Sequence, residues 1–154
     1  CISYPDAQAY ASWLSRRTGQ DYRLPSKQEW LAAARSIQGN GSPCRLGNVR
    51  DTSSKGLDLR YSCNDANANT APSGRYQETT LGLHDLHGNV AEWSSACSGG
   101  NSACSRHAVL GISWQDGPDI NVRNVRELES DRGYDDVGFR LVRDLRPAAR
   151  KNAE

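Results

Sequence analysis

The stretch Gly82–Trp93, with the sequence GLHDLHGNVAEW, is the most distinctive part of this chain, and we call it the signature turn. It combines the turn formers Gly and Asn with two carboxylates, Asp85 and Glu92, and it ends in a tryptophan. Carboxylates in such a turn can accept backbone hydrogen bonds. We therefore expect an ordered turn.

Length and composition indicate one small domain with much loop. The 154 residues are expected to form a single domain over 1–154. Only 36% of the residues are hydrophobic and phenylalanine occurs once, so the core has to rely on tryptophan, tyrosine and aliphatic side chains. The 14 glycines and many Asn, Asp and Ser residues favour turns and irregular segments.

The charge and hydropathy patterns argue against two classes of partner. A formal net charge of +1, with both signs interspersed, provides no basic face for nucleic acid. No apolar run approaches the roughly 18 residues that a spanning helix needs, so we expect no membrane insertion by this chain.

Two helices are expected before the signature turn. The first covers Pro5–Arg17, with Ala9, Trp13 and Leu14 on one face and Gly19 as its stop. A capping box from Ser26 to Glu29 opens the second helix, which continues through Arg35. The remaining elements are an extended segment at Tyr22–Pro25, a long loop at Gly39–Ala71, and strands at Ala108–Leu110, Ser113–Trp114 and Gly138–Val142.

Four of the five cysteines form two local pairs. Cys44 and Cys63 bracket one polar loop, and Cys97 and Cys104 bracket a short one rich in Gly and Ser. Each pair is expected to form a disulfide, which favours an extracytoplasmic (periplasmic or secreted) domain, although reduced cytosolic thiols are the alternative. Cys1 is left over.

The motifs Y-R-L-P-S-K-Q-E-W, G-L-H-D-L-H-G-N-V-A-E-W, G-I-S-W and G-F-R occur in this order. Together they closely resemble the formylglycine-generating enzyme-like, or sulfatase-modifying factor, superfamily. The resemblance implies an α+β fold, a variant of the C-type lectin fold with two helices, short twisted sheets and abundant irregular loop. It also implies core positions for Trp93 and Trp114 and an ion pair for Arg140. Because it begins at residue 2, the family's N-terminal strands are expected to be missing or to lie outside this chain.

The same resemblance argues against catalysis. Oxidase members of the family bind copper through two cysteines that follow the G-S-[WY] segment, and they convert a substrate cysteine to formylglycine. Aligned on Gly111–Trp114, those positions hold Asp116 and Asn121, and neither side chain offers the soft thiolate that Cu(I) prefers. We expect a domain that is not an enzyme.

Calcium is the cofactor that the resemblance implies. Relatives hold structural Ca²⁺ at the signature turn, and the corresponding residues are Asp85 and Glu92 by side chain and Gly88 and Val90 by carbonyl. The alternative is that the carboxylates only cap turns.

A zinc site is a weaker alternative for the histidines. His84 and His87 with Cys97 and Cys104 would form a His₂Cys₂ set. The cysteine spacing suits a disulfide better, and His107 is expected to be an ordinary strand-edge residue.

The acidic and arginine-rich segment after Trp114 is the expected recognition surface. Its proposed ligand-binding residues are Asp116, Asp119, Asn121, Arg123 and Arg126; solvated loops with surface ion pairs are the alternative. We expect a binding domain for an unknown protein or small molecule, such as the sensor domain of a larger, membrane-anchored bacterial Ser/Thr kinase. The alternatives are an enzyme with a non-cysteine centre, a lectin-fold variable receptor, and a structural partner.

Overall fold

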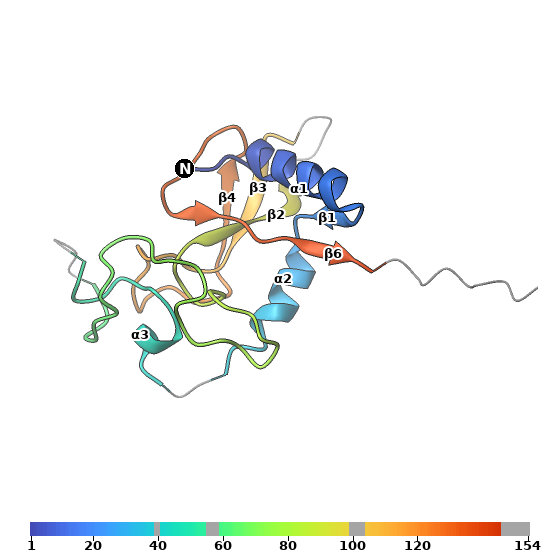
Figure 1. Ribbon diagram of the computed structural model, residues 1–154. Coiled ribbons are helices and arrows are strands. Elements are labelled where there is room, and N and C mark those ends of the chain that lie inside the picture. Colours follow the sequence, from blue (N-terminus) through green and yellow to red (C-terminus); the bar gives the residue numbers. More distant parts are fainter. Residues whose placement is uncertain (39–40, 55–58, 99–103, 146–154) are drawn as a thin grey trace, which may run out of the picture.

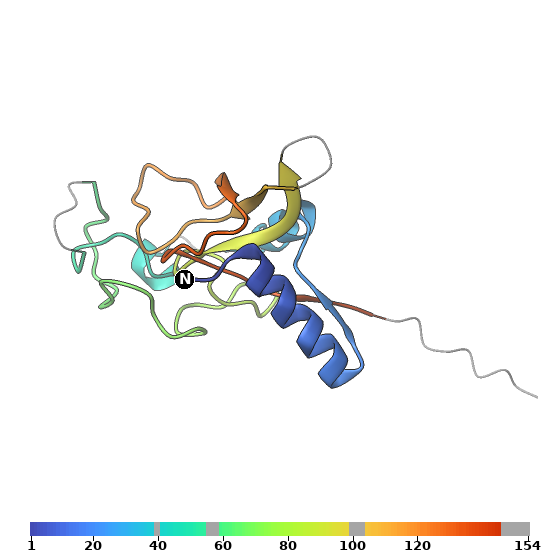
Figure 2. The ribbon, with the colours of Figure 1, turned by 90° about the horizontal axis from the view of Figure 1, so that it is seen from above.

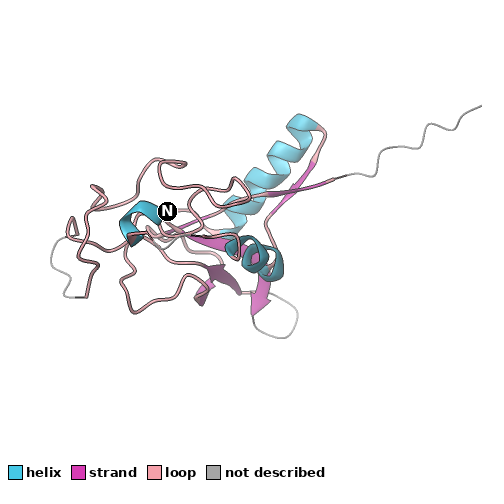
Figure 3. Ribbon diagram, turned by 90° about the horizontal axis from the view of Figure 1, so that it is seen from below, coloured by secondary structure: helices cyan, strands magenta, loops and turns pink. Residues whose placement is uncertain are grey.

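The computed structural model describes residues 1–38, 41–54, 59–98 and 104–145. Their helices and strands are α1 (Tyr4–Thr18), β1 (Asp21–Arg23), α2 (Lys27–Ala34), α3 (Pro43–Leu46), β2 (Ala91–Ser98), β3 (Arg106–Leu110), β4 (Val125–Glu129), β5 (Val137–Gly138) and β6 (Val142–Asp144). Figure 1 shows most of these elements in one half of the molecule and the loops around α3 in the other, and Figure 3 shows how much of the chain is loop. The expected α+β class is confirmed.

The centre of the fold is a four-stranded sheet in the order β4-β3-β2-β5. β3 is antiparallel to both β2 and β4, whereas β2 and β5 are parallel. A second, two-stranded sheet pairs β6 with β1, the strand that follows α1 (Figure 2). Sequence reasoning missed β2 and β4, although the signature turn leads directly into β2.

Neighbouring residues of β2 point to opposite faces of the sheet, because side chains alternate along a strand. Trp93 is fully buried on one face, which confirms its expected core position. The cluster on that face consists of Tyr4, Ala7, Leu24, Ala91, Trp93, Val109 and Val137. The cluster on the other face consists of Trp30, Ala34, Leu86 and Leu110. Helix α1 therefore covers the first face and α2 the second (Figure 1).

Glu92 is a buried carboxylate on the α2 side of β2, with only 4% of its surface exposed. Arg140 donates to it twice, from Nε to Oε2 and from Nη2 to Oε1, both at 2.6 Å. Trp30 Nε1 donates to Oε2 at 2.6 Å, and Arg140 Nη2 also donates to the carbonyl of His84 at 3.0 Å. The ion pair expected for Arg140 therefore joins α2, the signature turn, β2 and the segment after β5.

Both expected helices form, and each begins with a capping box. Ser3 caps α1 and Ser26 caps α2, each through reciprocal hydrogen bonds with the acidic residue three positions later. Gly19 ends α1 in the left-handed conformation, with φ of 67°.

The buried face expected for α1 was wrong. The buried residues are Tyr4, Ala7 and Ala11, whereas Ala9 and Trp13 are exposed and Leu14 is half-buried. Alanine has a short side chain, so this face of the helix can approach the sheet closely, and Trp13 is left 49% exposed.

Two of the expected strands need correction, whereas Ala108–Leu110 is confirmed as part of β3. Ser113–Trp114 is a turn, in which the N–H and hydroxyl of Ser113 donate to Asp116 Oδ2 at 2.7 and 2.9 Å. Trp114 is consequently half-buried instead of lying in the core. Gly138–Val142 is divided between β5 and β6, which belong to different sheets.

Both expected disulfides are confirmed. The Cα atoms of Cys44 and Cys63 lie 6.1 Å apart, and those of Cys97 and Cys104 lie 5.8 Å apart. Cys1 is free and exposed.

The long loop expected over Gly39–Ala71 is mostly irregular, but it contains the short helix α3. Residues 39–40 and 55–58 of this loop lie outside the described ranges. Val49 and Ile112 are buried against Cys44 in a small third cluster, which gives the loop half of the molecule its own anchor.

The buried ion pair generates a stability prediction. Glu92→Gln leaves the Arg140 guanidinium buried without its counter-charge. We therefore expect the free energy of unfolding, measured in urea, to fall by about 3–5 kcal/mol. The matched control is Glu129→Gln, which breaks the exposed pair with Arg132 at 3.3 Å. That change should cost about 1 kcal/mol or less. An equal fall in the free energy of unfolding in the two variants would show that the buried pair stabilises the fold no more than the exposed pair does.

Candidate functional site

Gly88 and Asn89, in the middle of the signature turn, bind three separate loops together. Both have positive φ, and a Cβ on Gly88 would lie 2.1 Å from the carbonyl oxygen of Asn48, so only glycine fits there. The N–H of Asn89 donates to the Asn48 carbonyl at 2.7 Å, and its carbonyl accepts from the N–H of Trp114 at 2.9 Å. Its side chain bonds both the N–H and the carbonyl of Ala71, at 2.9 and 3.1 Å.

A cavity of about 400 Å³ lies against this turn, lined in part by Asp85, Val90, Glu92 and Arg140. Asp85 Oδ2 accepts from the N–H of Gly74 at 2.7 Å. Asp85 Oδ1 is buried and has no hydrogen-bond partner among the described residues. Asp85 therefore keeps one carboxylate oxygen available for a cation or another donor.

Glu92 lines the same cavity, but both of its carboxylate oxygens already bind Arg140. Burial alone would lower the pKa of Arg140; the charge and hydrogen bonds of Glu92, with the charge of Asp85, instead raise it above its ordinary value. The guanidinium therefore stays charged, and a cation at Glu92 would have to share these oxygens with it. Of the residues expected to hold calcium, the structure brings Asp85, Val90 and Glu92 to the cavity, whereas Gly88 packs against the backbone of Asn48.

The five residues expected to bind ligand do not form one open face. Asp116 Oδ2 is used by Ser113, and Arg126 Nη2 lies 2.8 Å from the buried carboxylate of Asp136. These two residues organise their own loops.

The other three expected ligand residues are exposed. Asn121 Oδ1 accepts from the N–H of Arg123 at 2.8 Å, and Asp119 lies 3.4 Å from the guanidinium of Arg50. Asp119, Asn121 and Arg123 thus reach the surface, although Asp119 and Asn121 each make one contact within the domain.

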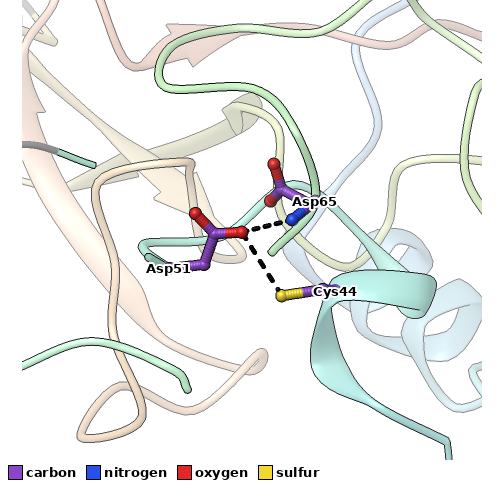
Figure 4. Close-up of side chains that lie close together, drawn as sticks. All are labelled: Cys44, Asp51 and Asp65. Atoms are coloured by element: carbon purple, nitrogen blue, oxygen red, sulfur yellow. Dashed lines mark hydrogen bonds between the residues drawn. The ribbon is translucent and has the colours of Figure 1, made fainter. Parts of the chain in front are cut away.

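A pair of buried aspartates in the loop half escaped the sequence analysis. Asp51 and Asp65 lie with Cys44 such that one polar atom of each is within 4.8 Å of the other two, as Figure 4 shows. Cys44 is bonded to Cys63, so its sulfur is not a thiolate ligand. No sequence motif links these residues, which are brought together only by the folding of the loop.

Backbone N–H groups satisfy both of these carboxylates. Asp51 accepts from the N–H groups of Ser53, at 2.8 Å, and Asp65. Asp65 accepts from Val49 at 2.9 Å and Asn67 at 2.8 Å. Burial raises the pKa of Asp65 and the charge of Asp51 adds to this effect, while the hydrogen bonds oppose it. The pair serves to shape the loop.

The zinc alternative receives no support from the described residues. Cys97 and Cys104 are bonded to each other, and His84 Nδ1 lies 2.9 Å from the carbonyl of Tyr76. Burial lowers the pKa of His87. The histidine beside Cys104 is instead His107, which is 6% exposed and not the strand-edge residue expected.

Curated relatives match part of the chain. It is 33% identical over 100 residues to the formylglycine-generating enzyme of Mycobacterium tuberculosis, a match that covers 61% of this chain and 31% of the enzyme. It is also 33% identical over 92 residues to the serine/threonine-protein kinase Pkn1 of Chlamydia trachomatis serovar L2, covering 60% of this chain and 12% of the kinase. The chain thus spans less than a third of the length of either relative.

Solved structures match nearly the whole chain. PvdO from Pseudomonas aeruginosa superposes with a TM-score of 0.78 at 25% identity, over 94% of this chain and 61% of PvdO. Treponema denticola variable protein 1 superposes with a TM-score of 0.72 at 17% identity, over 91% of this chain and 68% of that protein, and so supports the fold alone. These neighbours confirm the expected lectin-like variant fold.

The family comparison covers nearly the full length as well. The model of the family described as "Sulfatase-modifying factor enzyme 1-like domain" matches residues 1–145. With the fold and the signature turn, this match means that the chain belongs to the sulfatase-modifying factor enzyme 1-like domain family.

Proposed function

We propose that this chain is a non-catalytic recognition domain of a larger protein. The proposal is supported by the contacts of Asp116 and Asn121, the residues that the alignment on Gly111–Trp114 places at the positions of the copper-binding cysteines in oxidase relatives. Asp116 closes the turn at Ser113 and Asn121 caps the N–H of Arg123. Both side chains have local structural partners and neither offers a thiolate.

The surroundings of the domain are part of the same proposal. Two disulfides favour an oxidising compartment. None of the helices in the described ranges combines the length and apolar character that crossing a bilayer requires. The match to part of a Ser/Thr kinase supports a sensor domain in a larger, membrane-anchored bacterial protein. Exposed Asp119, Asn121 and Arg123 are the proposed contacts for a protein or small-molecule ligand.

The catalytic alternative can be tested directly. We expect purified protein to bind no stoichiometric copper(I) and to consume no oxygen with a cysteine-containing peptide. Because Cys1 is a free exposed thiol, both measurements should use a Cys1→Ser background. Adding Asp116→Cys and Asn121→Cys to this background supplies two thiols, and this variant should take up copper(I). Stoichiometric copper with oxygen uptake by the Cys1→Ser protein would overturn the proposal.

We also propose that the signature turn binds a structural Ca²⁺. The buried, unpartnered Oδ1 of Asp85 beside the cavity supports this, and Val90 and Glu92 line the same space. Carboxylate and carbonyl oxygens are the ligands that calcium prefers. Because Glu92 is shared with Arg140, we expect weak binding in the millimolar range.

Thermal unfolding with and without millimolar Ca²⁺ tests this site. We expect calcium to raise the melting temperature and the Asp85→Asn substitution to abolish the rise, since Ca²⁺ at about ten times a millimolar Kd stabilises the folded state by about 1.4 kcal/mol. Asp119→Asn, which removes an exposed carboxylate elsewhere, should keep the response. If the unaltered protein melts at the same temperature with and without Ca²⁺, Asp85 and its neighbours only shape the turn.

A further inference from the structure

The two disulfides lie in very different surroundings. Cys97 is exposed, and Cys104 is half-buried and lines a surface cavity of about 580 Å³. Cys44 is only 8% exposed, within the third hydrophobic cluster. Cys63 is half-buried, as Cys104 is, so the two disulfides differ in access at their other cysteine, which is exposed at Cys97 and buried at Cys44.

A buried histidine is in contact with the accessible disulfide. His107 lies opposite Cys97 in the ladder between β2 and β3. Cys104 Sγ lies 3.4 Å from Nε2 and 3.6 Å from Nδ1 of the His107 ring. A ring N–H at this distance can donate a hydrogen bond to a thiolate on Cys104, which makes that sulfur a better leaving group.

The ring of His107 is held in place by two contacts on other elements. Its centroid lies 3.4 Å from that of the Tyr4 ring, with the planes 14° apart. Its Nδ1 lies 2.7 Å from Ser130 Oγ. Burial lowers the pKa of His107, so the ring is neutral near pH 7. If the Ser130 hydroxyl donates to Nδ1, Nε2 carries the proton and faces the sulfur.

The charged side chains around the same cavity nearly balance. Arg106, Glu129 and Asp131 line it with Cys104. The Glu129 carboxylate lies 3.3 Å from Arg132. The carbonyl oxygen of Arg106 lies 3.1 Å from Cys104 Sγ and cannot donate to it, so His107 is the side chain in contact with this sulfur that can stabilise negative charge there.

The Cys44–Cys63 disulfide lies beside a carboxylate, which disfavours a thiolate. Asp51 Oδ2 lies 3.4 Å from Cys44 Sγ, and Asp51 is fully buried (Figure 4). A carboxylate so close to a developing thiolate raises its free energy through like-charge repulsion. Cys44 is thus a poor leaving group as well as an inaccessible one.

We propose that Cys97–Cys104 is a thiol–disulfide exchange site that accepts two electrons from a dithiol, whereas Cys44–Cys63 is structural. In the first step a thiolate of the reductant attacks Cys97 Sγ, the Cys97–Cys104 bond breaks, and the electron pair leaves on Cys104 Sγ beside His107. The second thiol of the reductant then attacks the mixed disulfide and releases the sulfur of Cys97. The reductant becomes a disulfide, and its two protons end on the two cysteines.

Reduction of Cys97–Cys104 is expected to leave the fold intact. β2 and β3 remain paired at Glu92 with Leu110 and at Trp93 with Val109, well away from the disulfide. The bond closes a separation of only 7 residues, against 19 for Cys44–Cys63, so its loss relaxes the unfolded chain less. Reduction and reoxidation can then occur without unfolding.

The test compares the two disulfides in the unaltered protein. Native protein is exposed to limiting dithiothreitol, quenched with an alkylating reagent over time, and mapped by peptide mass spectrometry. We expect Cys97 and Cys104 to be alkylated at least about tenfold faster than Cys44 and Cys63. Equal rates, or faster reaction of Cys44 and Cys63, would overturn the proposal whatever any variant does.

Two variants separate the effect of the imidazole from that of access. His107→Phe keeps a flat ring against Tyr4 but removes both nitrogens, so we expect Cys97–Cys104 to react about tenfold more slowly. Ser130→Ala removes the partner of Nδ1 and should slow it by a smaller factor. Cys44–Cys63 is the control within the same molecule, because general loosening of the fold would speed its reduction. An unchanged Cys97–Cys104 rate in folded His107→Phe would rule out the role of the imidazole.

Discussion

The buried pair between Glu92 and Arg140 is the constraint on which the rest of the molecule depends. A carboxylate that is 4% exposed needs its full set of donors, and these come from Arg140 and from Trp30 of α2. The guanidinium also reaches the carbonyl of His84 in the signature turn. A helix, a central strand, a turn and the segment before β6 must therefore all be correctly placed before one charge pair is satisfied. The large cost of leaving either charge unpaired makes the arrangement specific.

The parts of the fold that sequence reasoning predicted are those set by short-range chemistry. The capping boxes at Ser3 and Ser26 and the stop at Gly19 depend on residues within one helical turn. Both disulfides connect cysteines that are near neighbours in the chain. The buried face of α1 could not be predicted in this way, because Ala7 and Ala11 are buried for their small size against the sheet and not for their hydrophobicity.

In the candidate site, too, the sequence predicted the local features and missed the contacts between distant segments. The sequence identified the carboxylates of the signature turn, and the structure brings Asp85 and Glu92 to one cavity. The sequence could not reveal that Arg140 is hydrogen-bonded to Glu92, that Asp116 closes a turn with Ser113, or that Asp51 lies close to Asp65. Each of these contacts depends on where a loop returns, and loop paths are decided by many weak backbone interactions.

Asn89 illustrates how a molecule with so much loop can keep one shape. Its contacts with Asn48, Ala71 and Trp114 include the backbone N–H or carbonyl of each partner, groups that nearly every amino acid supplies. The anchoring of three loops therefore depends little on the identity of their side chains. Side chains on these loops can therefore be exchanged while the attachment points persist, so that sequence changes at the surface need not destabilise the domain.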